Sequence, residues 1–347
     1  MNKHKIPKEY LFIVLLSFIS IGLYAQKLNM NKVKVSYLQL PLQPLNENIK
    51  TYNSELNINV TFENTDIEKL RNQYLKLYGY KLIKEEEDVL IQAEFGDFNI
   101  DKNLISDDVY NVNQGKNIIG YYYKISCTYP VKLSITTKNG QILFEKNIKH
   151  DEKLMNNDFE KWTYSSSELD TKFNNEKTNI INEIKNKCDK KALTEIRDIL
   201  KSNFSYINVT KKIKIASGKG KKYDYSDLES AVIHVEKAFE MISSKSAQEN
   251  INTELNKTIE IWNNALKESS NNKKARINNE ISTMLYYNIG IAYWWMLDFP
   301  KANKYLAQAF EKNANRSTPS KSDDKLIKEV IDQINDYKNR LKIHSKI

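Results

Sequence analysis

Glycine, proline, histidine and cysteine are scarce in this chain of 347 residues, which has 9, 6, 4 and 2 of them. So few glycines leave little material for loops that cradle phosphates, and no P-loop or nucleophile-elbow motif occurs. No His-Glu-x-x-His or Cys-x-x-Cys spacing occurs that would bind a metal. We therefore expect a protein without catalytic residues, metal or cofactor. A hydrolase whose carboxylates meet only in the fold is the third-ranked alternative.

Long apolar runs are also rare, and the one that matters lies at the N-terminus. The basic start "MNKHKIPK" precedes an apolar run from Leu11 to Leu23, which Tyr24 and Ala25 follow. This run is too short to span a bilayer as a helix, and the small residue after it suits cleavage before Gln26. We expect residues 1–25 to be a signal peptide. The mature chain is then exported to the periplasm, the cell surface or the medium and has no membrane span, with an uncleaved anchor as the minor alternative.

Charge of one sign does not dominate any region of the chain. The formal net charge is +9, from 53 Lys and Arg against 44 Asp and Glu, and the two signs are interspersed. We therefore expect no nucleic-acid partner. The densest basic cluster, "GKGKK" at residues 218–222, favours a solvated linker. It divides the mature chain into a domain over residues 26–216, a linker over 217–225 and a helical domain over 226–347.

Alternating and helical patterns predict an α+β fold for the first domain, a mixed β-sheet with helices packed on one side. Strands are expected at residues 33–40, 56–62, 89–95, 121–135 and 205–216. A helix begins at Thr65, which has capping-box spacing to Glu68, and a longer helix ends near Leu200.

A hairpin gives the first domain its most specific prediction. The odd positions of residues 121–135 are apolar or aromatic, and Asn139-Gly140 supplies a two-residue turn. In that register Ile135 faces Phe144 and Val131 faces Ile148. Lys146 breaks the apolar pattern, and Pro130 indicates a bulge or an edge position.

The two cysteines lie on the apolar faces of their elements. Cys127 belongs to the strand of that hairpin and Cys188 to the long helix that follows. Export permits a disulfide between them. Two buried thiols and one structural disulfide are both compatible with this pattern, and neither favours a catalytic thiol.

Downstream of residue 225 the pattern is helical throughout. Five helices are expected, at residues 227–242, 251–267, 275–297, 300–312 and 324–342, with short polar loops between them. Within "YYNIGIAYWWMLDFPKANKYLAQAF" (residues 286–310), this domain resembles a tetratricopeptide repeat. The residues that match the repeat core are Tyr286, Ile289, Gly290, Tyr293, Ala302, Leu306 and Ala309.

The resemblance implies a surface for a partner. In this family the inner, concave side of the repeat usually receives a peptide or protein, and here that side would present Tyr287, Ile291, Trp294 and Trp295. The alternative is that the first domain or the last helix covers these four residues. The helix that carries them is apolar nearly all round, so it must be covered on more than one side.

These patterns favour a non-catalytic adaptor of the bacterial cell envelope that binds another protein through the repeat-like module. The first alternative is a module that binds a glycan or another small ligand through exposed aromatic side chains.

Overall fold

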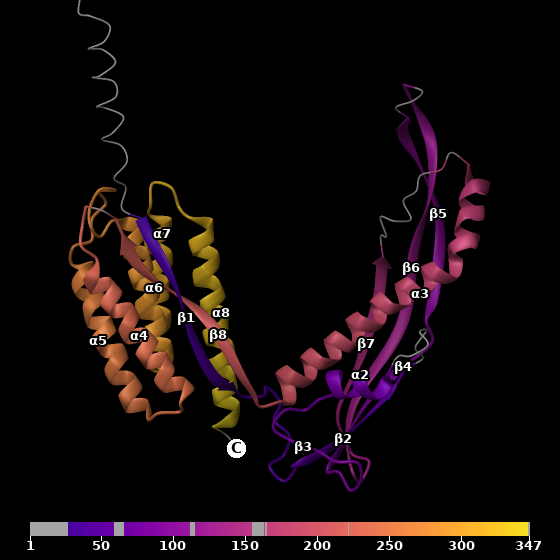
Figure 1. Cartoon of the computed structure of the whole chain (residues 1–347), viewed down its shortest axis with the longest axis horizontal. Coiled ribbons are helices and arrows are strands. Elements are labelled where there is room, and N and C mark those ends of the chain that lie inside the picture. Colours follow the sequence, from indigo (N-terminus) through magenta and orange to yellow (C-terminus); the bar gives the residue numbers. More distant parts are fainter. Residues whose placement is uncertain are drawn as a thin grey trace, which may run out of the picture. The chain divides into compact units, whose positions relative to one another are not determined.

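The computed structural model describes residues 27–58, 66–111, 115–154, 163, 165–220 and 222–345, so the expected signal peptide lies outside the described residues. The chain forms two compact units (Figure 1). Unit 1 comprises Met1–Gln39 and Asn208–Ile347, and unit 2 comprises Leu40–Ile207. Unit 2 is therefore an insertion within unit 1. No helix within the described ranges is both long and apolar enough to cross a membrane.

Unit 2 is built on a mixed sheet, as the sequence predicts. Its strands run in the order β3-β2-β4-β6-β5, and β7 pairs with β6. β2 is parallel to β3 and β4, whereas β6 is antiparallel to β4, β5 and β7. The strands are β2 (Thr51–Asn57), β3 (Lys81–Leu82), β4 (Val89–Phe95), β5 (Asn99–Asn111), β6 (Lys116–Thr137) and β7 (Ile142–Leu154).

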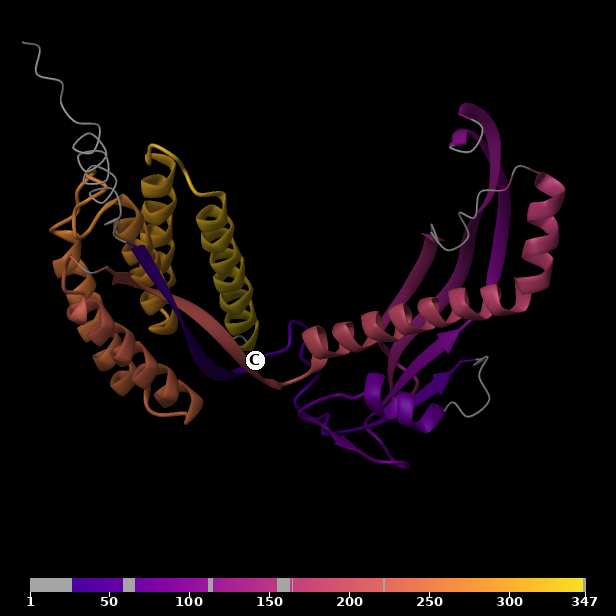
Figure 2. The same cartoon turned by 45° about the horizontal axis from the view of Figure 1, so that its top comes forward.

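Helices cover one face of this sheet (Figure 2). They are α2 (Ile67–Tyr74) and α3 (Ser166–Ile199), and α3 continues into the π-helical turn Leu200–Phe204. α3 packs its stripe of Ile184, Cys188, Ala192 and Ile196 against the odd positions of β6. The predicted cap Thr65 lies outside the described residues, and Asp66 caps α2 by accepting a hydrogen bond from the Lys69 N–H.

The two predicted pairs of the hairpin are confirmed, because Ile135 pairs with Phe144 and Val131 pairs with Ile148. The predicted two-residue turn is wrong. The register shifts by one residue after Ile135, so that Thr136 pairs with Ile142, and the Thr137 N–H donates to the Gln141 carbonyl. The turn therefore contains residues 138–140, and Gly140 takes a left-handed conformation with φ of 79°. Pro130 lies in a central strand opposite a bulge, where residues 96–98 separate β4 from β5. The N–H group that proline lacks therefore interrupts no regular ladder.

Unit 1 combines an antiparallel pair of strands with five helices. The strands are β1 (Lys27–Gln39) and β8 (Ile207–Lys219), and the helices are α4 (Ser226–Ser243), α5 (Gln248–Leu266), α6 (Asn279–Trp295), α7 (Phe299–Ala314) and α8 (Lys321–His344). Cross-strand contacts show the antiparallel direction, because Ser36 bonds Thr210 whereas Asn31 bonds the Ile215 carbonyl. All five predicted helices are present.

The predicted division of the chain at residues 217–225 needs correction. β1 and β8 were expected in the first domain, but Val35 and Ile215 belong to the apolar core of the helices. Gly218 lies so close to the Tyr225 ring that a Cβ atom would be 2.1 Å from ring carbon Cδ1. β8 and α4 therefore belong to one unit, and the helical domain contains two strands. Local patterns could not assign β1, because its partner lies far away in sequence.

Candidate binding groove beside β7

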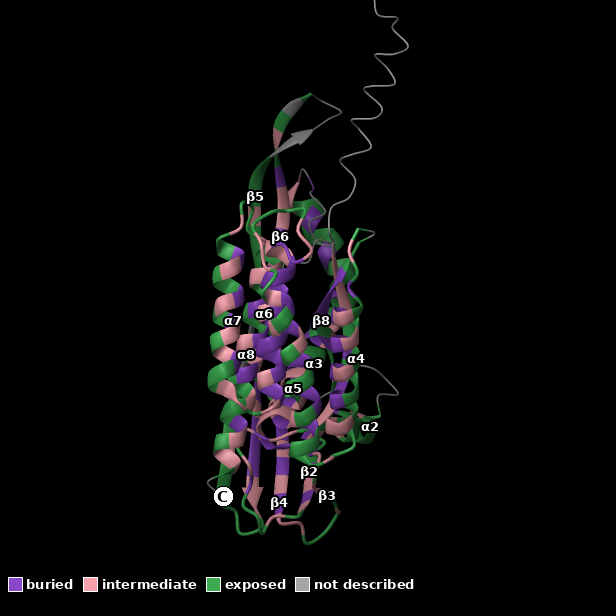
Figure 3. Cartoon of the chain, turned by 90° about the vertical axis from the view of Figure 1, so that its left-hand side faces the viewer, coloured by how far each residue is buried: buried purple, intermediate pink, exposed green. Residues whose placement is uncertain are grey.

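The four aromatic and aliphatic residues expected on a concave face are buried. They belong to α6, which Figure 3 shows largely in the colour of buried residues. Tyr287 is 1% exposed and Trp294 is 0% exposed, and Ile291 and Trp295 are equally enclosed. Trp295 contacts Tyr37 of β1, Phe239 of α4 and Tyr337 of α8 through ring edges and faces. The expectation that Tyr287, Ile291, Trp294 and Trp295 form an open partner-binding face is corrected, because β1, α4 and α8 cover them.

The residues matched to the repeat core bring α6 and α7 together. A Cβ atom on Gly290 would lie 2.7 Å from Leu306 Cγ and 3.2 Å from the Ala302 carbonyl oxygen, so only glycine permits this approach. The contact is the one that the resemblance implies for a helical hairpin. Membership of the repeat family stays a prediction. Ile289, Ala302, Leu306 and Ala309 are buried, whereas Tyr286 and Tyr293 are partly exposed.

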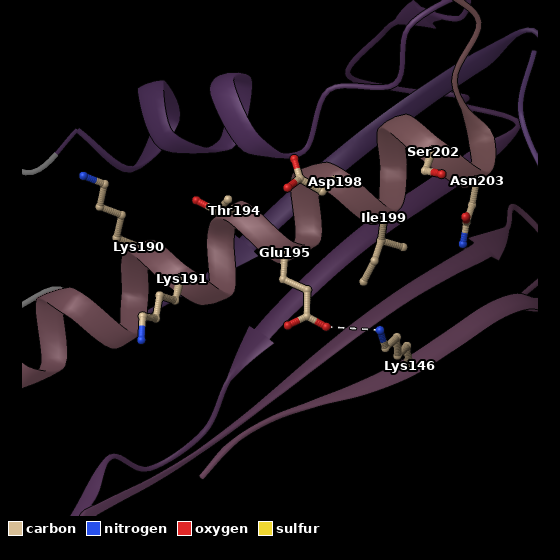
Figure 4. A pocket seen from close by; sticks show the side chains of 9 residues that line it. All are labelled: Lys146, Lys190, Lys191, Thr194, Glu195, Asp198, Ile199, Ser202 and Asn203. Atoms are coloured by element: carbon tan, nitrogen blue, oxygen red, sulfur yellow. Dashed lines mark hydrogen bonds and ion pairs between the residues drawn. The ribbon is translucent and has the colours of Figure 1, made fainter. Parts of the chain in front are cut away.

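A groove in unit 2 lies where α3 passes β7 (Figure 4). Its volume is about 710 Å³, and one wall is the C-terminal half of α3 with the π-helical turn. The other wall is Lys146 of β7, whose ammonium group lies 3.1 Å from the Glu195 carboxylate. The remaining lining residues are Lys190, Lys191, Thr194, Asp198, Ile199, Ser202 and Asn203.

The strand beside this groove has an open edge. The Lys138 N–H donates to the Asp88 carbonyl on the β4 side, while the Thr137 N–H donates to Gln141 on the β7 side. Backbone groups alternate along a strand, so odd positions of β6 bond β7. Phe144, Lys146 and Ile148 pair opposite odd positions.

It follows that Glu145 and Asn147 direct their N–H and C=O groups away from β6. In the described part of the chain no strand pairs with that edge of β7.

Backbone hydrogen bonds fix the end of the groove. The Leu42 N–H donates to the Ser202 carbonyl at 3.1 Å, and the Gln43 N–H donates to the Asn203 carbonyl at 2.7 Å. The chain that enters unit 2 thus satisfies carbonyls of the turn that ends α3. Ser202 and Asn203 of this turn also line the groove. Their backbone is held by these two hydrogen bonds, whatever their side chains contact.

The groove carries a small excess of positive charge. Three lysines line it against two carboxylates, Glu195 and Asp198. Lys146 contacts Glu195, and Arg197 contacts Asp198 at 3.0 Å. Lys190 adds an exposed ammonium group on the same helix. Each of the two carboxylates therefore has a cationic neighbour, and the lining as a whole carries one more positive than negative charge.

Buried polar clusters elsewhere consist of charged side chains paired with each other. Lys185 donates to Asp189 at 3.0 Å and to the Tyr129 hydroxyl at 3.3 Å, between α3 and β6. Burial, with the Asp189 carboxylate beside it, raises the pKa of the Tyr129 hydroxyl. In unit 1, Glu254 accepts bonds from Lys257, Lys237 and His234. Within the described ranges no three His, Cys, Asp or Glu side chains are placed to hold a metal ion.

Tyr123 of β6 is held between α3 and the sheet. Tyr123 donates its hydroxyl to Asp170, and its ring contacts Phe173 edge-on with the centroids 5.4 Å apart. Lys102 covers the same ring at 4.0 Å. The contacts of Tyr123 therefore belong to the packing of α3 against the sheet.

One groove residue, Lys146, stands out in the sequence, because it breaks the apolar pattern of the predicted hairpin. Lys146 interrupts an apolar stripe because its side chain leaves the core to reach Glu195. The groove residues of α3 lie on a face that looks like any solvated helix surface. β5 was also missed, since its Asp107 and Asp108 favour a turn, although the strand is exposed enough to carry them.

Comparisons with known proteins add no family to this picture. No protein-family model matches the chain, and no curated protein matches it. A functional assignment therefore depends on the geometry of the chain itself.

Proposed function

We propose that this chain is a non-catalytic adaptor of the bacterial cell envelope, and that it binds an extended segment of another envelope polypeptide along β7. The observation that carries the proposal is the backbone of β7, where Glu145 and Asn147 offer N–H and C=O groups at an edge beside a groove. Extended peptides bind such edges through main-chain hydrogen bonds, while neighbouring pockets select their side chains.

The other long edge of the sheet is a weaker candidate. Within the described residues β5 pairs with β6 alone, and it carries Asp101, Lys102, Asp107 and Asp108. β7 is charged to a similar degree from Glu145 to Lys153, so charge does not distinguish the two edges. The groove distinguishes them, and β7 also begins with Ile142 and Leu143, which are 58% and 38% exposed. Exposed aliphatic side chains on an unpaired edge favour a strand partner, and they are costly if nothing covers them.

The charge of the groove indicates the kind of segment that fits. Lys190 lies exposed on the wall of the groove that α3 forms, and Glu195 is already paired with Lys146. A segment with a carboxylate near the end of the groove would meet ammonium groups, whereas a basic segment would be repelled. We therefore specify the occupant as an extended, acidic segment of another protein.

The test is a selection of random linear peptides displayed on phage, with the purified chain as bait. A recovered peptide is then measured against Asn147→Pro and its matched control Asn147→Thr by fluorescence polarisation. Proline removes the outward N–H but no bond to β6, and edge strands tolerate it. Threonine keeps the N–H. Loss of one main-chain bond that leaves a peptide carbonyl unpaired should raise Kd about tenfold in the proline variant only.

Circular dichroism and the unfolding midpoint establish that both variants remain folded. A peptide that binds the proline and threonine variants equally would contradict strand addition. Recovery of basic peptides, or of peptides whose binding survives Lys190→Glu with Lys191→Glu, would contradict the specified charge.

A further inference from the structure

The two cysteines of the chain lie against each other. Cys127 Sγ on β6 and Cys188 Sγ on α3 are 3.3 Å apart, and both side chains are buried. Around them pack aromatic and aliphatic side chains of both elements, namely Tyr123, Ile125, Tyr129, Phe173, Ile180 and Ile184. No other cysteine occurs in the sequence, so each thiol has a single intramolecular partner.

We infer that Cys127 and Cys188 form an intramolecular disulfide in the folded, exported protein, and that this bond fastens α3 to β6. A disulfide brings its two sulfur atoms to about 2 Å. The observed separation leaves little more than 1 Å to close, which side-chain rotation supplies. Burial then keeps reductants away from the bond once it has formed.

The oxidation requires a disulfide carrier, such as an oxidised thiol-disulfide oxidoreductase or oxidised glutathione. One cysteine thiolate attacks a carrier sulfur, which forms a mixed disulfide and releases the first carrier thiolate. The second cysteine thiolate then attacks the Sγ of the first, and the second carrier thiolate leaves. The protein loses two protons and two electrons, and the carrier is reduced to two thiols. Both steps occur during folding, before α3 covers the strand.

The bond would lie close to the groove wall. Cys188 precedes Glu195 by seven residues, which corresponds to about 10 Å along a helix. A fixed point there limits how far the C-terminal half of α3 can lift from the sheet. The inference depends on export into an oxidising compartment, but it does not depend on which ligand the groove binds.

The test counts thiols in the whole mature chain. The chain is refolded in a buffer of reduced and oxidised glutathione, quenched with acid, denatured and treated with N-ethylmaleimide before mass spectrometry. We expect no label on the wild type and two labels after reduction, and peptide mapping should join the segments around residues 127 and 188. Cys127→Ala is the control, because its remaining thiol cannot close an intramolecular bond and should take a label or a glutathione.

Full-length protein isolated from the cell envelope of an expressing bacterium gives the second measurement. The same cross-linked peptide pair is expected there. Two labelled thiols on the correctly folded, refolded chain, or glutathione on both cysteines, would overturn the inference. So would a chain that folds only when both thiols are kept reduced.

Discussion

Asn288 of α6 is the side chain whose loss should most clearly report how unit 1 is held together. It is 0% exposed, and its carbonyl accepts from the Ala216 N–H at 3.0 Å while its amide donates to the Ala216 carbonyl at 2.8 Å. Both backbone groups belong to β8. One asparagine therefore does for the edge of β8 what a neighbouring strand would do.

The expected cost of Asn288→Ala follows from these two bonds. Each buried backbone group left without a partner costs about 1–3 kcal/mol. Alanine recovers roughly 0.6 kcal/mol through its higher helix propensity. The substitution should therefore lower the free energy of unfolding of unit 1 by about 1.4–5.4 kcal/mol. With a urea m-value of about 2 kcal/mol/M, the midpoint should fall by about 0.7–2.7 M.

Tryptophan fluorescence in a urea titration suits this measurement, because Trp262, Trp294 and Trp295 are all buried in unit 1. Asn335→Ala is the matched control, since Asn335 is exposed on α8 and its loss should change stability by less than about 0.5 kcal/mol. A midpoint for Asn288→Ala equal to that of the control would refute the reasoning. It would mean that β8 does not depend on α6 for its hydrogen bonds.

Three further predictions concern pH, redox state and topology. Hydrogen bonds from Lys257 and His234 lower the pKa of Glu254 from 4.5 to about 2, so its stabilisation is complete above pH 4.5 and is lost as the pH falls towards 2. Glu254→Gln should flatten the decline of stability over that range in an acid titration followed by circular dichroism. The disulfide would close a loop across a sequence separation of 61, so oxidised protein should be about 4 kcal/mol more stable than reduced protein in thermal unfolding. A difference below about 1 kcal/mol would contradict this. The register of Ser36 with Thr210 places Gln39 opposite Ile207, so replacing residues 40–206 by Asn-Gly should leave a helical unit 1 that unfolds cooperatively. An unfolded product would show that unit 1 requires the insertion.

Local patterns predicted those parts of the fold whose partners are close in sequence. The pairing of β6 with β7 follows from a short turn and an alternating stripe, and Ile135 does pair with Phe144. The one-residue register shift next to the turn leaves no trace in the alternating pattern. The hairpin of α6 and α7 follows from Gly290 and Leu306, which lie on two helices joined by a short turn. In both cases the chain has too little length between the elements to choose another partner.

The features of the fold that the sequence patterns did not predict depend on partners that are distant in sequence. The burial of Trp294 depends on β1 and α8, and the pattern of α6 alone says only that it needs cover on several sides. Likewise Val33 and Val35 alternate in the same way whether β1 joins the sheet of unit 2 or the helices of unit 1. Asn288 and the helices that enclose β8 decide between the two arrangements. β1 ends at Gln39, whereas the first of these helices begins at Ser226, so the deciding contacts are far from β1 in sequence.

The insertion of unit 2 also explains how the end of the groove is held in place. Because unit 2 enters and leaves between two paired strands, its first and last segments must lie near each other. Leu42 and Gln43 on the way in bond the carbonyls of Ser202 and Asn203 on the way out. Ser202 and Asn203 line the end of the groove beside β7. Eight of the nine groove residues lie within residues 190–203, on a helix face with the mostly polar pattern of any solvated surface. Lys146 of β7 is therefore the one sequence feature that indicates the groove.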